Sequence, residues 1–302
     1  MLQVIISPAK KMRIDADAWG LAPAGAPASP DAPGALPPFP RKSAALVGRL
    51  QSMGRGELKS LWKTSDRLTD ESLAATAALA VQAGGEPVAP DVAARLTPAA
   101  FSYDGIQYTS LAATVMDARA LAWLQAHLWI VSGLYGCVRP FTGVMPYRLE
   151  MGAPLRMPGS AGQPERAESA TPCRNLYEYW GADIAHAACG AGGASPQQAT
   201  CVVNLASVEY AKAVLPHLPA SARCVTCVFG ELLRDGKPVQ RATASKVARG
   251  SMVRWMAETG VEDPSDLVRF SVGYRFAPEL SSTDGAGGGT LVFMRDGSRG
   301  RP

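Results

Sequence analysis

The chain has 302 residues, of which 47% are hydrophobic and 19% are charged. A chain of this length can bury roughly three quarters of its unfolded surface, which excludes a small protein held together mainly by disulfides. Its 30 Lys and Arg residues stand against 26 Asp and Glu residues, a net charge of +4. Any binding of phosphate must therefore come from the placement of basic residues rather than from bulk charge.

The first predicted element is a buried strand over Leu2–Ile6, which ends sharply at Ser7-Pro8 because proline cannot donate within a sheet. A signal peptide has a basic region before its apolar run, and no such region precedes this one. The apolar stretch at 120–138 contains polar residues and glycines, unlike a membrane span. We expect a cytoplasmic protein with no membrane partner, whose six cysteines stay reduced.

Residues 21–40 are unusual in composition, since fifteen of these twenty positions are Pro, Ala or Gly. Such a segment offers few side chains to bury and few backbone donors. We expect an extended or disordered surface excursion that carries no chemistry.

Helical spacing follows over 42–50 and over 57–68. In the second helix Lys59, Lys63 and Arg67 recur at every fourth position, opposite a leucine-rich face, which places three cations along one stripe. The stripe is either a solvated helix face or a surface that contacts phosphate.

The rest of the chain alternates strand and helix patterns. We predict helices over 116–128 and 244–258, with helical spacing also at 210–214, and strands over 128–131, 201–203, 224–229, 268–276 and 290–294. This alternation predicts the α/β class, with a mixed central sheet, flanking helices and one compact domain. Cys224 and Cys227 lie three apart on a predicted strand and so face opposite ways, which favours a structural role over a metal or redox site.

Small polar residues follow the predicted core strands: Ser7, Ser132, and Ser207 with Asn204. In open α/β sheets the crevice outside the carboxyl ends of the strands binds ligands, so these groups and Lys10 form one pocket if the strands are neighbours. The alternative is that Ser and Asn only cap turns, as they do routinely.

The segment 132–151 is dense in groups that contact polar ligands: Tyr135, Arg139, Tyr147, Arg148 and Glu150. Arginine suits bidentate recognition of phosphate or carboxylate, and tyrosine can stack on a base. Glycines in the same segment, at 133 and 136, allow a close backbone approach to a ligand. Alternatively, Arg148 and Glu150 form an internal ion pair on one face of an extended segment.

Residues 236–257 contain no acidic residue but several basic ones, and Lys246 and Arg249 share a helix face there. A few such residues on phosphates give a salt-dependent affinity that does not specify a base sequence.

Six strings in this order resemble the YaaA family of bacterial peroxide-stress proteins: ISPAK (6–10), LWIVSGLYGCVRP (128–140), PYRLEMG (146–152), LYEYWG (176–181), NLASVEYAK (204–212) and KVARG (246–250). The resemblance extends from residue 1 to about 295, which sets a domain of 1–295 and a flexible tail of 296–302. The blocks add Trp180, Tyr210 and Lys212 to the pocket candidates. Departures are the excursion at 21–40, a Pro/Gly/Ser-rich loop at 158–172, and Val247 where many relatives have lysine, which weakens the expected DNA binding.

The resemblance implies a cytosolic protein that aids survival of hydrogen peroxide, limits free iron and binds DNA through a positively charged cleft. It also implies a helix-hairpin-helix-like element, for which residues 58–73 are the candidate. No cofactor or metal is expected, since the sequence has no cluster of His, Asp and Glu suited to a ferritin-like iron store. The expected partners are duplex DNA, without sequence specificity, and a nucleotide-like small molecule, and the expected state is a monomer.

Two functions remain open. The first is a non-catalytic DNA-binding stress protein that contacts phosphates through Lys59, Lys63, Arg67, Lys246 and Arg249. The second is an enzyme acting on a nucleobase, a nucleotide or damaged DNA, in which Lys10 or Glu150 performs acid-base chemistry beside the strand-end hydroxyls.

Overall fold

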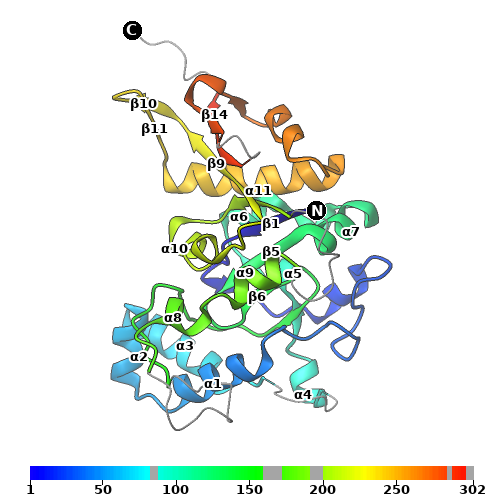
Figure 1. The fold of residues 1–302 in the computed structure, drawn as a ribbon. Helices are drawn as coiled ribbons and strands as arrows, with labels where there is room; N and C mark the ends of the chain where they lie inside the picture. The colour runs from blue at the N-terminus through cyan, green and yellow to red at the C-terminus, as the bar shows by residue number, and fades with distance from the viewer. Residues whose placement is uncertain (82–87, 159–171, 191–199, 284–287, 297–302) are drawn as a thin grey trace.

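A mixed sheet of eight strands forms the centre of the protein (Figure 1). The computed structural model describes residues 1–81, 88–158, 172–190, 200–283 and 288–296. The strands are β1 (Leu2–Ile6), β5 (Leu128–Ser132), β6 (Gly136–Val138), β8 (Cys201–Leu205), β9 (Arg223–Gly230), β12 (Tyr274–Phe276), β13 (Ser282–Thr283) and β14 (Gly289–Arg295). They run in the order β12-β14-β9-β8-β1-β5-β6, with β13 beside β14.

The inner part of the sheet is parallel. β14, β9, β8, β1 and β5 pair in parallel, whereas β12, β13 and β6 join antiparallel. Every residue of β1, β5 and β8 is buried, which explains why these segments are continuous apolar runs rather than alternating patterns. From β1 the chain goes first to β5 on one side and later to β8 on the other, so β1 marks a topological switch point.

Helices flank the sheet, and a further group of helices lies at one end of the protein. The helices α1 to α4 lie together at the bottom of Figure 1, and α11 crosses the upper half beside α6 and α7. The helices are α1 (Pro40–Gln51), α2 (Arg55–Trp62), α3 (Asp66–Ala77), α4 (Pro90–Ala93), α5 (Ala99–Ser102), α6 (Ile106–Leu111), α7 (Ala118–His127), α8 (Leu176–Trp180), α9 (Asp183–Ala188), α10 (Val208–Ala211) and α11 (Ala242–Thr259).

Short elements complete the fold. Three two-stranded pairs lie outside the main sheet: β2 (Lys11–Met12) with β4 (Tyr103–Asp104), β3 (Thr97–Pro98) with β7 (Gly143–Val144), and β10 (Leu232–Arg234) with β11 (Lys237–Val239). The 3₁₀ turns include η1 (Ala16–Leu21), η2 (Ala113–Val115), η4 (Leu215–His217), η5 (Pro264–Arg269) and η6 (Pro278–Leu280). The described helices include none that is both long and apolar enough to cross a bilayer.

The predicted α/β class with a mixed sheet and flanking helices is confirmed, but one predicted helix is wrong. Residues 57–68 do not form a single helix: α2 ends at Trp62, and α3 begins at Asp66. Lys63 lies between them in the left-handed region, with φ of 51°. The break removes the register that placed three cations on one stripe, because residues on two separate helices do not share a face.

Two further expectations need correction. Only Tyr274–Phe276 of the predicted strand over 268–276 is extended, because Pro264 starts a 3₁₀ helix that runs to Arg269. The Pro- and Ala-rich segment at 21–40 is not simply a surface excursion. It forms turns, and Ala35 is fully buried and accepts a hydrogen bond of 2.7 Å from the Gly143 N–H.

The strand carrying the CxxC sequence has the predicted geometry. Along β9 the odd positions 225, 227 and 229 are buried and the even positions 224, 226 and 228 are half-buried, so the two cysteines face opposite ways. Neither cysteine forms a disulfide. Most of the loop at 158–172 and of the tail at 296–302 lies outside the described residues.

Close packing of α11 on α6 depends on a glycine. A Cβ at Gly250 meets the Gln107 carbonyl oxygen at 2.1 Å, so the two backbones touch where no side chain fits. This contact fixes the first half of α11 against the segment that follows Gly105.

We predict opposite effects of two Gly→Ala substitutions within helices. Gly250→Ala should lower the free energy of unfolding by roughly 1–3 kcal/mol or more, because the new methyl group meets backbone. Gly48→Ala, on the exposed face of α1 with no atom within 4 Å, should raise it by roughly 0.5–1 kcal/mol. Denaturant unfolding of both variants measures this difference, and an unchanged Gly250→Ala variant would contradict the packing argument.

Candidate functional site

A cavity of about 510 Å³ lies beyond the carboxyl ends of β1 and β8, at the switch point of the sheet. Its wall comes from the turn after β1, from α6, from the extended segment 147–150, from α10 and from α11. The residues that line it are Ser7, Pro8, Ala9, Lys10, Lys11, Asp104, Gly105, Ile106, Gln107, Tyr108, Tyr147, Arg148, Leu149, Glu150, Ser207, Glu209, Tyr210, Lys246 and Arg249.

The turn after β1 is held in place by hydrogen bonds from two segments, the loop after β8 and helix α6. The Ser7 hydroxyl accepts from the Ser207 N–H at 2.8 Å and donates to the Ser207 hydroxyl at 3.2 Å. The Ser7 carbonyl accepts from the Gln107 amide at 3.1 Å and from the Tyr108 hydroxyl at 2.9 Å. Ser7 and Ser207 therefore both line the cavity and fix the loops that carry Lys10 and Glu209.

For Ser132 and Asn204 the turn-capping alternative is correct. The Ser132 hydroxyl accepts from the Leu134 and Tyr135 N–H groups at 3.2 and 2.9 Å, and the Asn204 side chain accepts from the Ala206 N–H at 3.0 Å. Both residues are buried, and neither lines the cavity.

Ser132 is hydrogen-bonded to Tyr147, which lines the cavity. Since two backbone donors occupy its oxygen, the Ser132 hydroxyl donates to the Tyr147 hydroxyl at 2.7 Å, which in turn lies 3.0 Å from the Tyr103 hydroxyl. Burial raises the pKa of Tyr147 to about 12. The phenol is therefore neutral at physiological pH and serves as a hydrogen-bonding group rather than as a base.

The glycine of the turn after β5 admits protein backbone and not a ligand, contrary to expectation. A Cβ at Gly133 meets the Leu149 carbonyl oxygen at 2.4 Å, so only glycine lets segment 147–150 pack onto this turn. That packing places Arg148 and Glu150 in the cavity wall.

Part of the cavity's charge is internally paired. Lys10 Nζ lies 2.8 Å from Glu150 Oε1, Lys11 Nζ lies 2.6 Å from Asp104 Oδ2, and Arg148 makes a longer contact of 3.5 Å with Glu150. The internal ion pair considered for Arg148 and Glu150 therefore exists, but it is part of the cavity wall.

The remaining positive charge has no counterpart. Five basic side chains line the cavity against three acidic ones. Neither Lys246 nor Arg249 forms an ion pair with any described residue. Arg249 is half-buried, and burial lowers the pKa of its guanidinium group. A partly desolvated guanidinium group without a carboxylate partner is suited to binding an anion.

A second hollow of about 240 Å³ adjoins the cavity and shares Glu150 and Glu209 with it. Its other wall is the end of α2, including Trp62 and Lys63. Lys63 is exposed and makes no ion pair with the described residues, so a third uncompensated cation lies at the edge of the same surface.

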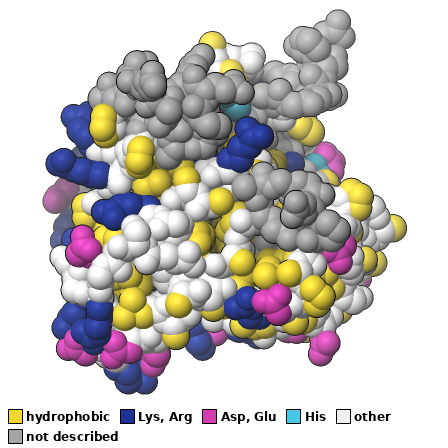
Figure 2. Space-filling model, turned by 90° about the horizontal axis from the view of Figure 1, so that it is seen from below, with side chains coloured by type: hydrophobic (Ala, Val, Ile, Leu, Met, Phe, Trp, Pro, Cys, Tyr) yellow, Lys and Arg dark blue, Asp and Glu magenta, His cyan; other side chains and the backbone are white. Residues whose placement is uncertain are grey.

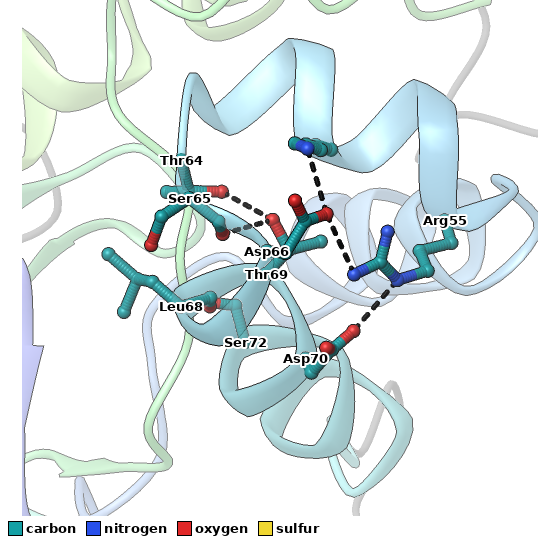
Figure 3. Close-up of polar contacts among 9 residues, drawn as sticks. Arg55, Thr64, Ser65, Asp66, Leu68, Thr69, Asp70 and Ser72 are labelled. Carbon is teal, nitrogen blue, oxygen red and sulfur yellow. Dashed lines mark hydrogen bonds and ion pairs between the residues drawn. The ribbon is translucent and has the colours of Figure 1, made fainter.

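The remaining cations of the α2–α3 hairpin are neutralised locally (Figure 3). Arg55 binds Asp66 and Asp70 at 3.0 and 2.7 Å, and Lys59 binds Asp66 at 2.7 Å. Arg67 pairs with Glu71, one turn further along α3, at 3.4 Å. Figure 2, which looks onto the end formed by α1 to α4, shows basic side chains in several groups, with acidic ones beside those at the lower edge.

Four other predicted pocket residues do not line the cavity, because each has a structural contact elsewhere. The Tyr135 hydroxyl accepts from the Met145 N–H at 3.2 Å, and Trp180 donates to the Gly133 carbonyl at 3.0 Å. Arg139 stacks on Trp129 and binds the carbonyls that end α7. Lys212 lies 4.8 Å from the centre of the Tyr177 ring.

Sequence analysis missed five polar residues of the wall: Lys11, Asp104, Gln107, Tyr108 and Glu209. Glu209 lies in the string 204–212 that resembles the family, but nothing in the sequence around it marks it as a residue of the site. The others belong to β2, β4 and α6, which are too short to produce a periodic pattern. No described residues form a group of three His, Cys, Asp or Glu side chains placed to hold a metal ion.

Comparisons with known proteins agree on one family. The family model described as peroxide stress protein YaaA matches residues 2–280. A UPF0246 protein of Limosilactobacillus fermentum is 38% identical over 299 residues, covering 98% of this chain and 100% of that protein. A UPF0246 protein of Pediococcus pentosaceus is 36% identical over 296 residues, covering 98% of both chains.

The Arg55 cluster predicts a pH-dependent contribution to stability. Hydrogen bonds from Lys59 and Arg55 lower the pKa of Asp66, and the hydrogen bond from Arg55 lowers the pKa of Asp70. Because these folded-state pKa values lie below the unfolded value of about 3.9, the stabilisation is complete above that pH and is lost as pH falls through the folded values.

We therefore expect Arg55→Gln to be less stable than the wild type near pH ~7, with the difference shrinking towards pH ~3. Chemical denaturation at several pH values measures the difference. Arg41→Gln is the matched control, because Arg41 is exposed on α1 and makes no ion pair with described residues. A deficit for Arg55→Gln that is constant with pH would contradict the role of the two aspartates.

Proposed function

Since this chain belongs to the peroxide stress protein YaaA family, we propose that it binds duplex DNA through the cationic cavity and its rim and thereby limits iron-dependent oxidative damage to DNA. The link to peroxide comes from the family. The link to iron comes only from the sequence resemblance, and the charge distribution of the cavity supports the DNA contact.

The observation that carries the proposal is the pair of uncompensated cations on α11. Lys246 and Arg249 lie one turn apart on the helix face that borders the cavity, and no described carboxylate neutralises either one. A phosphate supplies both the charge and the acceptor oxygens that a desolvated guanidinium group lacks. Such contacts position a duplex without reading its sequence.

The rim extends this charge towards the α2–α3 hairpin. Lys63 borders the hollow that shares Glu150 and Glu209 with the cavity, so the cations of α11 and of the hairpin turn face one continuous concave surface. Lys59 and Arg67 contribute less to the proposed surface, because their charges are held by Asp66 and Glu71. One copy of the chain is sufficient for this contact.

We expect Lys246→Gln and Arg249→Gln to weaken binding of a duplex of arbitrary sequence. Each should also reduce the dependence of log affinity on log salt by about one unit, as for a lost phosphate contact. Fluorescence anisotropy over a salt series measures both effects.

Arg67→Gln removes an equal charge from an ion pair outside the cavity wall and should lower affinity and salt slope less than either α11 variant does. Lys10→Ala should also bind nearly as well as the wild type, because Glu150 already neutralises Lys10. A wild-type chain that shows no salt-dependent binding to duplex DNA would refute the proposal.

A second candidate is an enzyme acting on a nucleobase, a nucleotide or damaged DNA. It is favoured by the contact of 2.8 Å between Lys10 and Glu150 inside the cavity, which places an amine and a carboxylate where they can exchange a proton with a bound base or sugar. The Ser7 and Ser207 hydroxyls lie on the same wall. A protein that only binds phosphates has no need of this pair.

Lys10→Ala and Glu150→Gln separate the two functions. If the cavity is catalytic, each variant should abolish protection against peroxide in cells that lack the wild-type copy while duplex binding by the purified protein stays intact. Survival after peroxide exposure and binding anisotropy are the two readouts. Full protection by both variants would eliminate the enzyme and leave the binding function.

A further inference from the structure

The hairpin β10–β11 lies outside the central sheet, in the connection from β9 to α11 (Figure 1). Its two strands pair only with each other, in the register Leu232 with Val239, Leu233 with Pro238, and Arg234 with Lys237. At the tip, Asp235 and Gly236 both have positive φ, 51° and 71°. The tip is therefore a tight two-residue turn of the kind for which Asp-Gly is a preferred sequence.

Two positive charges lie directly opposite each other next to this turn. Arg234 and Lys237 form the last cross-strand pair, both are exposed, and neither side chain forms a hydrogen bond or ion pair with any residue that the structure describes. Like charges in this position destabilise a hairpin. Asp235 has a reason to be there, since the turn favours it, but turn geometry does not demand the two cations.

The sides of the hairpin are apolar and open to solvent. All three residues of β10 are exposed, and the exposed fractions of Leu232 and Leu233 are 38% and 51%. A two-stranded ribbon is narrow enough to enter the major groove of a duplex, and exposed leucines can contact sugar and base edges there. Charge at the tip and apolar sides together suit a nucleic acid better than an acidic protein surface.

The hairpin is directly connected to the cavity. β11 ends at Val239, and α11 begins three residues later at Ala242. With a rise of 1.5 Å per residue, Arg249 lies about 10 Å along the helix from its start. The base of the hairpin and the cationic wall of the cavity are therefore separated by only two turns of one helix.

We propose that β10–β11 is a second DNA-contacting element, a β-ribbon whose Arg234 and Lys237 hold phosphates of the same duplex that lies over the cavity. This inference rests on the proposed function. It adds a binding site on a separate element, which extends the contact from a local cavity to a longer stretch of duplex.

Removing the two charges tests the ribbon. Arg234→Gln/Lys237→Gln should bind duplex DNA roughly tenfold more weakly than the wild type, with a salt slope about two units shallower. Its melting temperature should equal or exceed that of the wild type, because a like-charge pair is relieved, which excludes misfolding as the cause. Arg234→Lys/Lys237→Arg keeps both charges and should bind like the wild type.

Comparing two variants that each lose one positive charge shows whether a loss of affinity depends on the position of the charge or only on net charge. Arg234→Gln is set beside Arg41→Gln, an exposed and equally unpaired arginine at the far end of the molecule on α1. Equal losses of DNA affinity for these two variants would contradict the proposed role of the hairpin. Wild-type affinity and salt slope for the double Gln variant would also contradict it. If only the proposal for the hairpin is wrong, Lys246→Gln and Arg249→Gln still weaken binding to duplex DNA. If the wild type does not bind duplex at all, both proposals fail.

Discussion

Strand β1 imposes the constraint on which the site depends. It is hydrogen-bonded to β5 and β8 along its two edges and buried on both faces, so the chain leaves the sheet at Ser7-Pro8, between two neighbouring strand ends. The exit is locked by hydrogen bonds from Ser207, Gln107 and Tyr108. Lys10 is thereby held at the switch point, where an open α/β sheet has its ligand-binding crevice.

The α2–α3 hairpin and the cavity both contain several basic residues, but they differ in how many of these residues are paired with a carboxylate. The α2–α3 hairpin is rich in lysine and arginine, but Asp66, Asp70 and Glu71 neutralise three of its cations. The cavity holds fewer carboxylates than cations, and Arg249 is partly desolvated without one. An uncompensated charge that has already lost part of its hydration gains more from a bound phosphate than an exposed, paired one does.

Much of the fold was predictable because its signals are local. The continuous apolar runs of β1, β5 and β8 and the long helical period of α11 identify their elements correctly within a few residues. The single helix expected over 57–68 failed, because the apolar period continues across the turn at Lys63 and conceals the left-handed residue there. Likewise Ser132, Ser7 and Ser207 follow strands in the same way, yet only the last two reach the cavity.

The sequence by itself determined the strands, their polar ends, the excess of cations after residue 236 and the resemblance to one family, since each is recorded in residues close together along the chain. Only the tertiary structure decided which groups meet. It brought Lys10, Arg148 and Arg249 to one cavity from three distant segments and paired Lys59 with Asp66. The physical reason is that electrostatic compensation depends on distances of a few ångströms in space, and those are set by packing rather than by order along the chain.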